Sequence, residues 1–301
     1  MSAAELSALQ RPNDRLRRRR AVNRFMEVLA WLAAAVAVGI LGVVVWSVAK
    51  RGASELNLDL LTKTQAQNAF TLHPVSQGLA NAFAGSLVIV GLATLLALPV
   101  GILVAIYVNE FASRGVRNGV GLALDVLNGI PAIVIGIFVF GLLVAGHGPS
   151  GFAGAFALAV LMLPLVARST IEVLALVPDS LREASLGLGV PRWRTTLGIV
   201  LPQTIGGIVT GTVLAVARVA GETAPLLLTS SIVGTAIGWN PHHALFSVPL
   251  AIFELSESPE PADHARAWAA ALVLLLFILF ASLTARWLAT RSRRKIARAA
   301  G

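Results

Sequence analysis

Two charged residues interrupt an otherwise apolar stretch between residues 204 and 228. Arg218 and Glu222 stand four residues apart, which places both on one face of a helix near the small-xxx-small pattern of Gly207 and Gly211. A charge at the centre of a bilayer costs about 2.5–3.5 kcal/mol even on the helix-insertion scale, so each one demands a partner or a function. Two roles stay open. The planar guanidinium of Arg218 can contact a permeating anion such as phosphate, with Glu222 preventing tight binding, or the two charges form an ion pair that only holds helices together.

A second pair with the same spacing, Arg168 and Glu172, lies near the inner end of the apolar stretch 153–177. An inner gate or exit contact is one interpretation of this pair. The other, which we favour, is a pair of long side chains that reach the membrane interface. Asp125, at the start of another apolar stretch, is interpreted as a helix cap.

Signals for catalysis or metal binding are weak throughout the sequence. Cysteine is absent, neither H-E-x-x-H nor G-x-S-x-G occurs, and adjacent histidines alone are too few ligands for a metal site. The histidines all fall between apolar stretches: His73, His147, His242, His243 and His264. An ATP-binding phosphate loop requires a lysine after a glycine, which is not the context of Lys50, Lys63 or Lys295. We therefore expect no enzymatic activity, metal or cofactor in this chain.

The composition indicates the elements that must position these residues. Of 301 residues 56% are hydrophobic and 13% are charged, whereas soluble domains carry about a quarter charged residues. Apolar stretches of roughly twenty residues match a hydrocarbon core of ~30 Å, and in lipid a helix satisfies its own backbone. The sequence predicts an all-α polytopic membrane protein with six transmembrane helices, at residues 28–48, 83–107, 122–145, 153–177, 204–228 and 267–289. Pro131 in the third is either a helix break or an ordinary kink.

The positive charges predict the orientation of these helices. Nineteen of the 24 lysines and arginines flank alternate ends of the predicted segments, which places both termini and the interval 178–203 in the cytoplasm. The net charge of +9 thus follows membrane topology rather than a nucleic-acid surface. We expect a basic cytoplasmic tail over 1–27, a first transmembrane helix (a retained signal anchor) and outer loop over 28–82, a transmembrane domain over 83–289 and a basic cytoplasmic tail over 290–301.

The polar interval 178–203 is predicted to form a short helix, a turn and a second helix. Pro178 ends the preceding helix, and Gly189 can adopt the left-handed conformation that stops the next one. The residue before Pro191 is disfavoured in a helix, so the chain turns there. "RWRTTLGIVLP" then starts the second helix, which Pro202 disturbs.

These residues also carry a family resemblance. Glu183-Ala184-Ser185, Gly189, Ile199 and Leu201-Pro202 resemble the EAA loop of ABC importer permeases, whose pattern is E-A-A, three residues, G, nine residues and I-x-L-P. Ser185 in place of the second alanine is the one departure. The resemblance implies the type I ABC importer permease fold, with residues 179–202, hereafter the coupling loop, docking into a separate ATPase subunit. The implied docking residues are Glu183, Ala184, Ser185 and Gly189, with Arg182, Arg192 and Arg194 as contacts at the rim.

Further stretches resemble the permease subunits of phosphate-specific ABC importers. They are "RVAGETAPLLLT" at 218–229, "DVLNGIPAIVIGIFVFGLL" at 125–143 and the run at 162–189. The A-P-L continuation favours one of the two permease types of such importers over its sister. The resemblance implies that Arg218, Glu222 and Thr223 belong to the translocation pathway, and we add Arg168 and Glu172 to this set.

The resemblance also implies the partners. They are a homologous sister permease, two ATPase subunits that bind ATP and Mg²⁺, and an extracytoplasmic phosphate-binding protein, assembled in a bacterial cytoplasmic (inner) membrane. The chain would then be a non-catalytic subunit with inorganic phosphate as substrate. The alternatives are a permease for another oxyanion such as sulfate or molybdate, a stand-alone secondary transporter, which usually has an inverted repeat, or a membrane scaffold without flux.

Overall fold

The structure is a computed structural model that describes residues 14–64, 78–230 and 236–299. Within these residues every regular element is a helix. The elements are α2 (Asp14–Gly52), η1 (Ala53–Glu55), α3 (Leu58–Thr62), α4 (Ala80–Ile106), η2 (Tyr107–Phe111), α5 (Arg114–Gly129), α6 (Ala132–Val139), η3 (Phe140–Val144), α7 (Gly151–Leu174), α8 (Asp179–Gly187), α9 (Arg192–Thr195), η4 (Thr196–Val200), α10 (Leu201–Val219), α11 (Ala224–Thr229), α12 (Val248–Glu257) and α13 (Pro261–Ala299). Of the η elements, η1 is a 3-10 helix and η2, η3 and η4 are π-helical. Residues 1–51 form one compact unit and residues 52–301 the other.

The first unit consists of the single long helix α2. It begins within the basic run "RLRRRR" and continues through the predicted first crossing at 28–48. The apolar side chains of this helix are exposed along its length, Trp31 among them at 73%. A helix that is apolar on all sides with no packing partner within its unit is typical of a membrane span.

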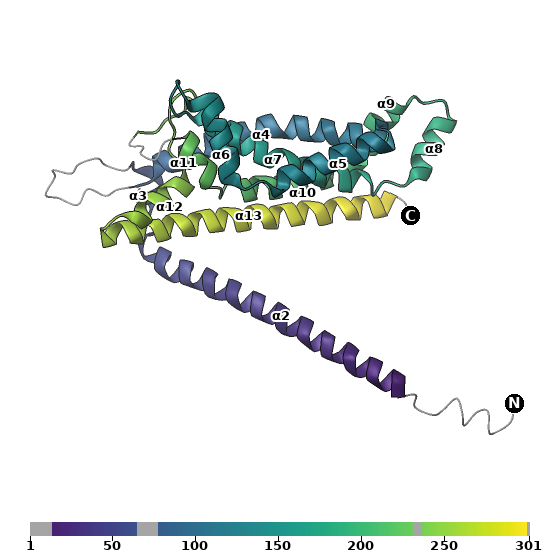
Figure 1. Cartoon of the computed structure of the whole chain (residues 1–301), viewed down its shortest axis with the longest axis horizontal. Coiled ribbons are helices and arrows are strands. Elements are labelled where there is room, and N and C mark those ends of the chain that lie inside the picture. The colour runs from purple at the N-terminus through teal and green to yellow at the C-terminus, as the bar shows by residue number, and fades with distance from the viewer. Residues whose placement is uncertain (1–13, 65–77, 231–235, 300–301) are drawn as a thin grey trace. The chain divides into compact units, whose positions relative to one another are not determined.

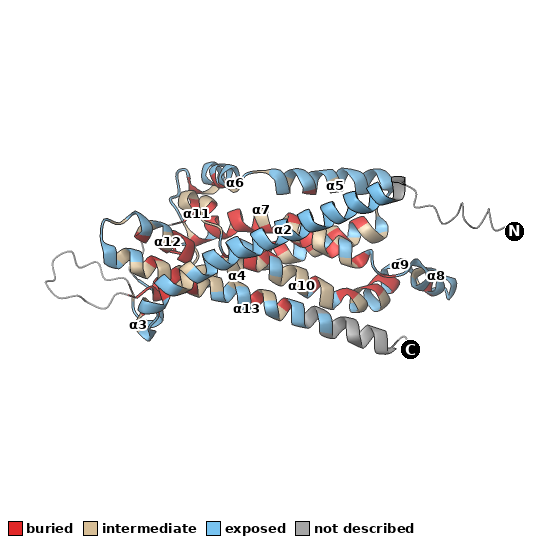
Figure 2. Cartoon of the chain, turned by 90° about the horizontal axis from the view of Figure 1, so that it is seen from below, coloured by how far each residue is buried: buried red, intermediate tan, exposed pale blue. Residues whose placement is uncertain are grey.

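Helix α7 is the centre of the second unit. It packs along α4 on one side and contacts α10, α5, α6 and α11 around its remaining surface. The most apolar stretch of α7 is 61% buried, whereas the corresponding stretches of α4 and α13 are each 22% buried. Figure 2 shows buried residues along α7, and exposed residues on the outer sides of α5 and α13. The outer helices therefore leave apolar surface for lipid or for another subunit.

Small side chains allow α4 and α7 to approach closely. The buried small residues are, in α4, Ala82, Ala84, Gly85, Ala93, Ala97, Gly101 and Ala105, and in α7, Gly151, Ala153, Gly154, Ala155, Ala157, Ala159 and Ala167. At Gly101 an added Cβ atom would lie 3.0 Å from Cγ1 of Val166, closer than ordinary van der Waals contact. Between helices in lipid there is little hydrophobic driving force, so such close packing is what holds the pair together.

The third predicted crossing, at 122–145, is not one straight helix. It consists of α5 and of α6 with its continuation η3, and the two parts are bent by 94°. Ile130 is extended, with ψ at 128°, because the residue before a proline disfavours the helical region, and Pro131 has no N–H to donate. Five helices in the described chain are long and apolar enough to cross a membrane, and six only if the bent pair counts as one span. Pro131 therefore marks a helix break rather than a kink.

The fifth predicted crossing, at 204–228, begins and ends earlier than expected. A continuous span runs from Arg192 through η4 to Val219, and a short turn then separates α10 from α11. In this turn the N–H of Glu222 donates to the carbonyl of Val219 at 3.0 Å. Beyond it α11 packs against α6, where an added Cβ on Gly136 would lie 2.8 Å from Cα of Pro225.

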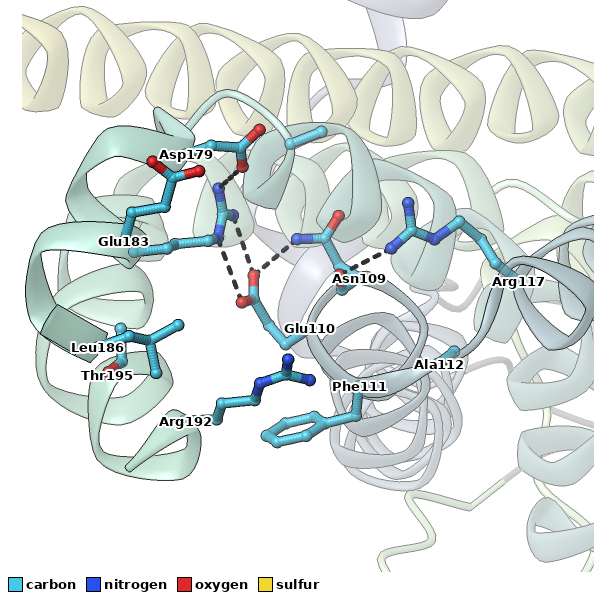
Figure 3. Close-up of a pocket in the computed structure, with 12 residues that line it drawn as sticks. Asn109, Glu110, Phe111, Ala112, Arg117, Asp179, Glu183, Leu186, Arg192 and Thr195 are labelled. Carbon is cyan, nitrogen blue, oxygen red and sulfur yellow. Dashed lines mark hydrogen bonds and ion pairs between the residues drawn. The ribbon is translucent and has the colours of Figure 1, made fainter. Parts of the chain in front are cut away.

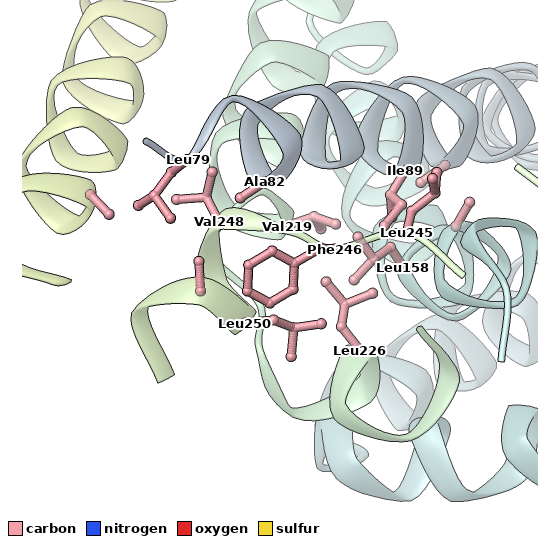
Figure 4. Packing of buried hydrophobic residues seen from close by; sticks show 14 of the residues in the cluster. Leu79, Ala82, Ile89, Leu158, Val219, Leu226, Leu245, Phe246, Val248 and Leu250 are labelled. Atoms are coloured by element: carbon pink, nitrogen blue, oxygen red, sulfur yellow. The ribbon is translucent and has the colours of Figure 1, made fainter. Parts of the chain in front are cut away.

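The segment leading into α12 closes the end of the second unit that lies opposite α8 and α9 (Figure 1). Phe246 is 3% exposed and packs among Leu226, Leu250 and Val219 (Figure 4). An added Cβ at Gly85 would lie 1.9 Å from the carbonyl oxygen of Phe246, so only glycine allows α4 to pass this close to the segment.

Three basic regions gather at the other end of this unit. They are the start of α5 with Arg114 and Arg117, the coupling loop, and the C-terminal end of α13 (Figure 1). The charge count assigned all three to one side of the membrane, and the fold brings them to one end of the bundle. That this end is cytoplasmic stays a prediction.

Candidate functional site

The coupling loop folds locally as the sequence predicts, into α8, a turn and α9. Gly189 has a φ of +79°, the left-handed conformation that glycine adopts without strain. The N–H of Gly189 donates to the carbonyl of Leu186 at 2.9 Å, and the N–H of Val190 donates to that of Ser185 at 3.2 Å. Pro191 then precedes the first residue of α9, where its fixed φ suits a helix start.

A buried pair of hydroxyl groups fixes α8 against α9. The Oγ of Ser185 and the Oγ1 of Thr195 lie 2.9 Å apart, and both residues are 4% exposed. Thr195 also donates to the carbonyl of Pro191 at 3.4 Å. Ser185 is the residue that departs from the E-A-A pattern, and its hydroxyl adds this hydrogen bond while keeping the side chain small.

Arg182 connects α8 to two other segments. Its Nε and Nη2 donate to the two carboxylate oxygens of Glu110 in η2, at 3.2 and 3.0 Å (Figure 3). Nη2 also donates to the carbonyl of Leu174 at 3.0 Å, and Nη1 donates to that of Val177 at 2.6 Å. A further bond of 3.0 Å joins Nη1 to Oδ1 of Asp179. The planar fork of arginine allows this two-pronged contact with a carboxylate, which a lysine could not make.

The position of Arg182 corrects one expectation. Its side chain is 17% exposed and that of Glu110 is 8% exposed, so the guanidinium points into the chain and does not form the expected contact at the rim. Glu110 also accepts from Nδ2 of Asn109 at 2.7 Å. Arg117 donates to the carbonyls of Val108 and Asn109, which holds η2 against the start of α5.

The outward surface of the coupling loop carries both apolar and charged side chains. Leu188 is 84% exposed and Trp193 is 54% exposed, which is unusual for large apolar residues unless a partner covers them. The guanidinium of Arg194 lies 5.0 Å from the centre of the Trp193 ring, within cation–π distance. The exposed residues expected to dock are Glu183, Ala184, Gly189, Arg192 and Arg194.

A cavity of about 540 Å³ lies between η2 and the coupling loop (Figure 3). Glu183 from α8 and Arg192 from α9 both line it. Within the described residues neither of these side chains forms an ion pair, so both charges are available to a docking partner.

The polar residues near the end of α10 are arranged differently from the helical expectation. Arg218 lies in the last turn of α10, whereas Glu222 and Thr223 follow in the turn before α11. The helix ends at Val219, so Arg218 and Glu222 do not share a helical face, and no ion pair joins them in the described chain. Arg218 is exposed and Glu222 is half-buried.

Close contact between α10 and α7 is confirmed at the two glycines of the small-xxx-small pattern. An added Cβ on Gly207 would lie 2.5 Å from Cγ1 of Val173, and one on Gly211 would lie 2.5 Å from Oγ of Ser169. These distances leave no room for a methyl group. The glycines thus set the spacing between the helix that carries Arg218 and the centre of the bundle.

Arg168 pairs with a different residue from the one its spacing suggests. Its Nη2 donates to the carbonyl of Gly121 at 2.6 Å and forms an ion pair with Asp125, both in α5. Glu172 is exposed and takes no part in this contact. Asp125 lies inside α5 rather than at a helix start, so the capping interpretation is wrong. The Nε of Arg168 is buried without a hydrogen-bond partner within the described residues.

At the opposite end of the unit, Glu254 in α12 is the residue with a perturbed acidity. Burial raises the pKa of Glu254 above its ordinary value, and the negative charge of Asp263 raises it further. Its Oε2 atom is buried and accepts no hydrogen bond in the described chain. Asp263 itself is held by Arg266 and by the hydroxyl of Ser258.

The histidines do not assemble into a site in the part of the chain that the structure describes. No three histidine, cysteine or acidic side chains there are grouped so that they could hold a metal ion. His147, His242, His243 and His264 lie in or near loops, and His73 falls outside the described residues.

Sequence reasoning missed the inner partners of the arginines. Glu110 lies in "YVNEF", a charged residue beside a predicted loop, where an exposed side chain is the ordinary expectation. Its one distinguishing signal is that it directly follows a long apolar stretch with no lysine or arginine at helical spacing. Asp125 gave a similar signal within an apolar stretch, but pairing by spacing within one helix pointed away from α5.

Comparison with known proteins gives matches along most of the chain. The family described as binding-protein-dependent transport system inner membrane component matches residues 97–294. The phosphate transport system permease protein PstA 1 of Mycobacterium tuberculosis is 44% identical over 225 residues, which cover 72% of each chain. The phosphate transport system permease protein PstA of Xylella fastidiosa is 37% identical over 286 residues, 92% of this chain and 96% of that protein. A crystal structure of a bacterial ABC transporter involved in alginate import aligns with 90% of this chain and 98% of that chain, with a TM-score of 0.60 at 18% identity.

Proposed function

The chain belongs to the family of binding-protein-dependent transport system inner membrane components, and from this premise we propose that it is a permease subunit of an ATP-driven phosphate importer. The observation that carries the proposal is the coupling loop, which has the spacing of an EAA loop and presents exposed Leu188 and Trp193 beside unpaired charges. Its relatives named as phosphate permeases support the choice of substrate. The chain would sit in the cytoplasmic membrane of a bacterium as half of the translocation pathway.

The energy for transport would come from other subunits. The chain has no lysine in a phosphate-loop context, so ATP and Mg²⁺ would bind to two ATPase subunits beneath the membrane. The coupling loop would seat in one of them, with Glu183, Arg192 and Arg194 as charged contacts. A sister permease of the same fold would complete the pathway, and an extracytoplasmic phosphate-binding protein would select and deliver the anion.

The polar residues of the membrane domain would contact phosphate in passage. Arg218 is exposed at the end of α10 and has no ion-pair partner among the described residues, which supports contact with an anion over a purely structural pair. Glu222 and Thr223 follow in a non-helical turn, and the Glu222 carboxylate would keep the anion from binding too tightly. Arg168, paired with Asp125, and the exposed Glu172 would act nearer the inner end of the path.

The seat of the ATPase is tested by reversing one charge. In Glu183→Lys we expect the amount of ATPase that co-purifies with the chain to fall about tenfold or more, because like charges placed across an interface cost several kcal/mol. Glu257→Lys makes the same change at an exposed position in α12, at the other end of the unit, and should leave co-purification unchanged. Equal recovery of the ATPase with both variants would contradict the docking role.

The substrate is tested with the complete complex in proteoliposomes. We expect ATP-dependent uptake of phosphate that excess sulfate or molybdate does not reduce. Uptake of those anions in preference to phosphate would assign the chain to a different oxyanion importer. Uptake by this chain alone, without ATPase subunits, would overturn the proposal.

A further inference from the structure

Glu110 lies outside the coupling loop, yet its carboxylate is the main partner of an arginine within that loop. The pair is largely removed from water, with the Glu110 side chain 8% exposed and that of Arg182 17% exposed. Removing two charges from water is costly, and the cost is recovered only where the geometry is good and the remaining polar atoms are satisfied. Here two hydrogen bonds join the pair, and Asn109 donates a third to Glu110. Such a contact is specific rather than incidental.

Arg182 is also what attaches α8 to the helices of the bundle. In the described chain α8 packs mainly against α9, and it is joined to its neighbours through Pro178 on one side and the turn at Gly189 on the other. Arg182 reaches back from α8 to the carbonyls of Leu174 and Val177, at the end of α7. A cation at this position suits the unpaired carbonyls and the negative end of the helix dipole.

The contacts of Arg182 therefore join α8 to two helices that already move as one. Glu110 lies in η2, which continues α4, and α4 packs along α7 through small residues. A push on α8 has two routes into the membrane domain. One follows the chain through α9 into α10, and the other passes through the guanidinium into α4 and α7. Without the second route, α8 can turn about Pro178 and Gly189 and leave α4 and α7 where they are.

We propose that the Glu110–Arg182 pair is the mechanical connection through which displacement of α8 carries α4 and α7 with it. Glu110 is then a positioning residue for coupling, although it lies about seventy positions before the coupling loop. The inference rests on the proposed function, because it requires an ATPase that moves α8.

The test measures phosphate transported per ATP hydrolysed by the complete complex in proteoliposomes. Glu110→Gln keeps the size of the side chain and removes its charge. We expect this complex to assemble and to hydrolyse ATP as the wild type does, while the transported phosphate per ATP falls about fivefold or more, the lower end of the usual range for coupling between sites. Glu110→Asp keeps the carboxylate and should recover part of the ratio.

Asp179→Asn is the matched control. It removes another carboxylate bonded to the same guanidinium, but the Asp179 side chain is 89% exposed and lies on α8 itself. It connects α8 to no other helix. The transported phosphate per ATP should therefore stay at the wild-type value in Asp179→Asn.

A covalent bridge provides an independent rescue, since the chain contains no cysteine. The double variant Glu110→Cys with Arg182→Cys lacks the ion pair and should be uncoupled like Glu110→Gln. Joining the two thiols with a short bismaleimide should restore the transported phosphate per ATP, because the proposal requires a rigid connection and not a charge. The complex is prepared with partner subunits that carry no accessible cysteine.

The outcomes separate the inference from the function on which it rests. A wild-type complex that takes up no phosphate with ATP contradicts the proposed function. A working wild type whose Glu110→Gln variant keeps its ratio, or whose bridged double variant stays uncoupled, overturns the inference. Failure of Glu110→Gln to assemble also counts against it, since the pair would then be needed for folding rather than for coupling.

Discussion

Replacing Ser185 and Thr195, singly and together, will measure how strongly their hydroxyl pair holds α8 against α9. Ser185→Ala leaves Thr195 able to donate to the carbonyl of Pro191, so it should cost about 0.5–1.5 kcal/mol, the net value of one hydrogen bond. Thr195→Val removes the partner of a buried Ser185 hydroxyl and should cost about 1–3 kcal/mol, the price of an unsatisfied polar group. The double variant removes both hydroxyls and should be less destabilised than Thr195→Val alone.

Hydrogen exchange of the α8 and α9 amides, measured on the purified chain in detergent, reports this local stability. A loss of about 1.4 kcal/mol lowers protection about tenfold, so Thr195→Val should exchange clearly faster than Ser185→Ala. The double variant should recover protection relative to Thr195→Val. Equal effects of the two single variants, or strictly additive effects in the double variant, would refute the reasoning and mean that Ser185 finds another acceptor in α8.

Two further predictions concern packing and acidity. Gly207→Ala places a Cβ atom 2.5 Å from Cγ1 of Val173. It should lower stability by about 1–3 kcal/mol, because overpacking forces α10 away from α7. Gly91→Ala adds a methyl group with nothing within 4 Å and should be neutral or slightly stabilising, so equal melting temperatures for the two variants would contradict the close contact. The raised pKa of Glu254 means that the folded chain holds this proton more tightly than the unfolded chain, so the associated stability is present below the ordinary value of 4.5 and is lost as pH rises through the raised value. Glu254→Gln should lack this loss, and a stability difference from the wild type that stays constant between about pH 4 and 7 would contradict it.

Much of the fold could be predicted from the sequence, because its main determinants are local. Long apolar stretches identify membrane helices, and the all-α permease architecture is confirmed by the described helices and by the alginate transporter alignment. The turn at Gly189 followed from glycine and proline chemistry alone. The family resemblance carried by the coupling loop is likewise confirmed by the matching family and the related phosphate permeases.

The sequence was least informative where a helix ends inside an apolar stretch. Hydrophobicity continues through Pro131 and through the turn after Val219, so one segment appears in each place where the chain has two helices. The spacing of Arg218 and Glu222 was then read on a helix that stops between them. The same limit applies to Arg168 and Arg182, because their partners Asp125 and Glu110 are remote in sequence and only tertiary packing brings them together.

The π-helical turn η4 between α9 and α10 has a geometric consequence. Pro202 has no N–H to donate four residues back, which disfavours an α-helical turn at this point. A π turn holds one residue more than an α turn, so everything before it is rotated by about 100° relative to an unbroken helix. The number of residues between positions 196 and 200 therefore sets the compass bearing at which Trp193 and Arg194 leave the axis of α10. Deleting one of them would swing that bearing round without altering the seam between α10 and α7.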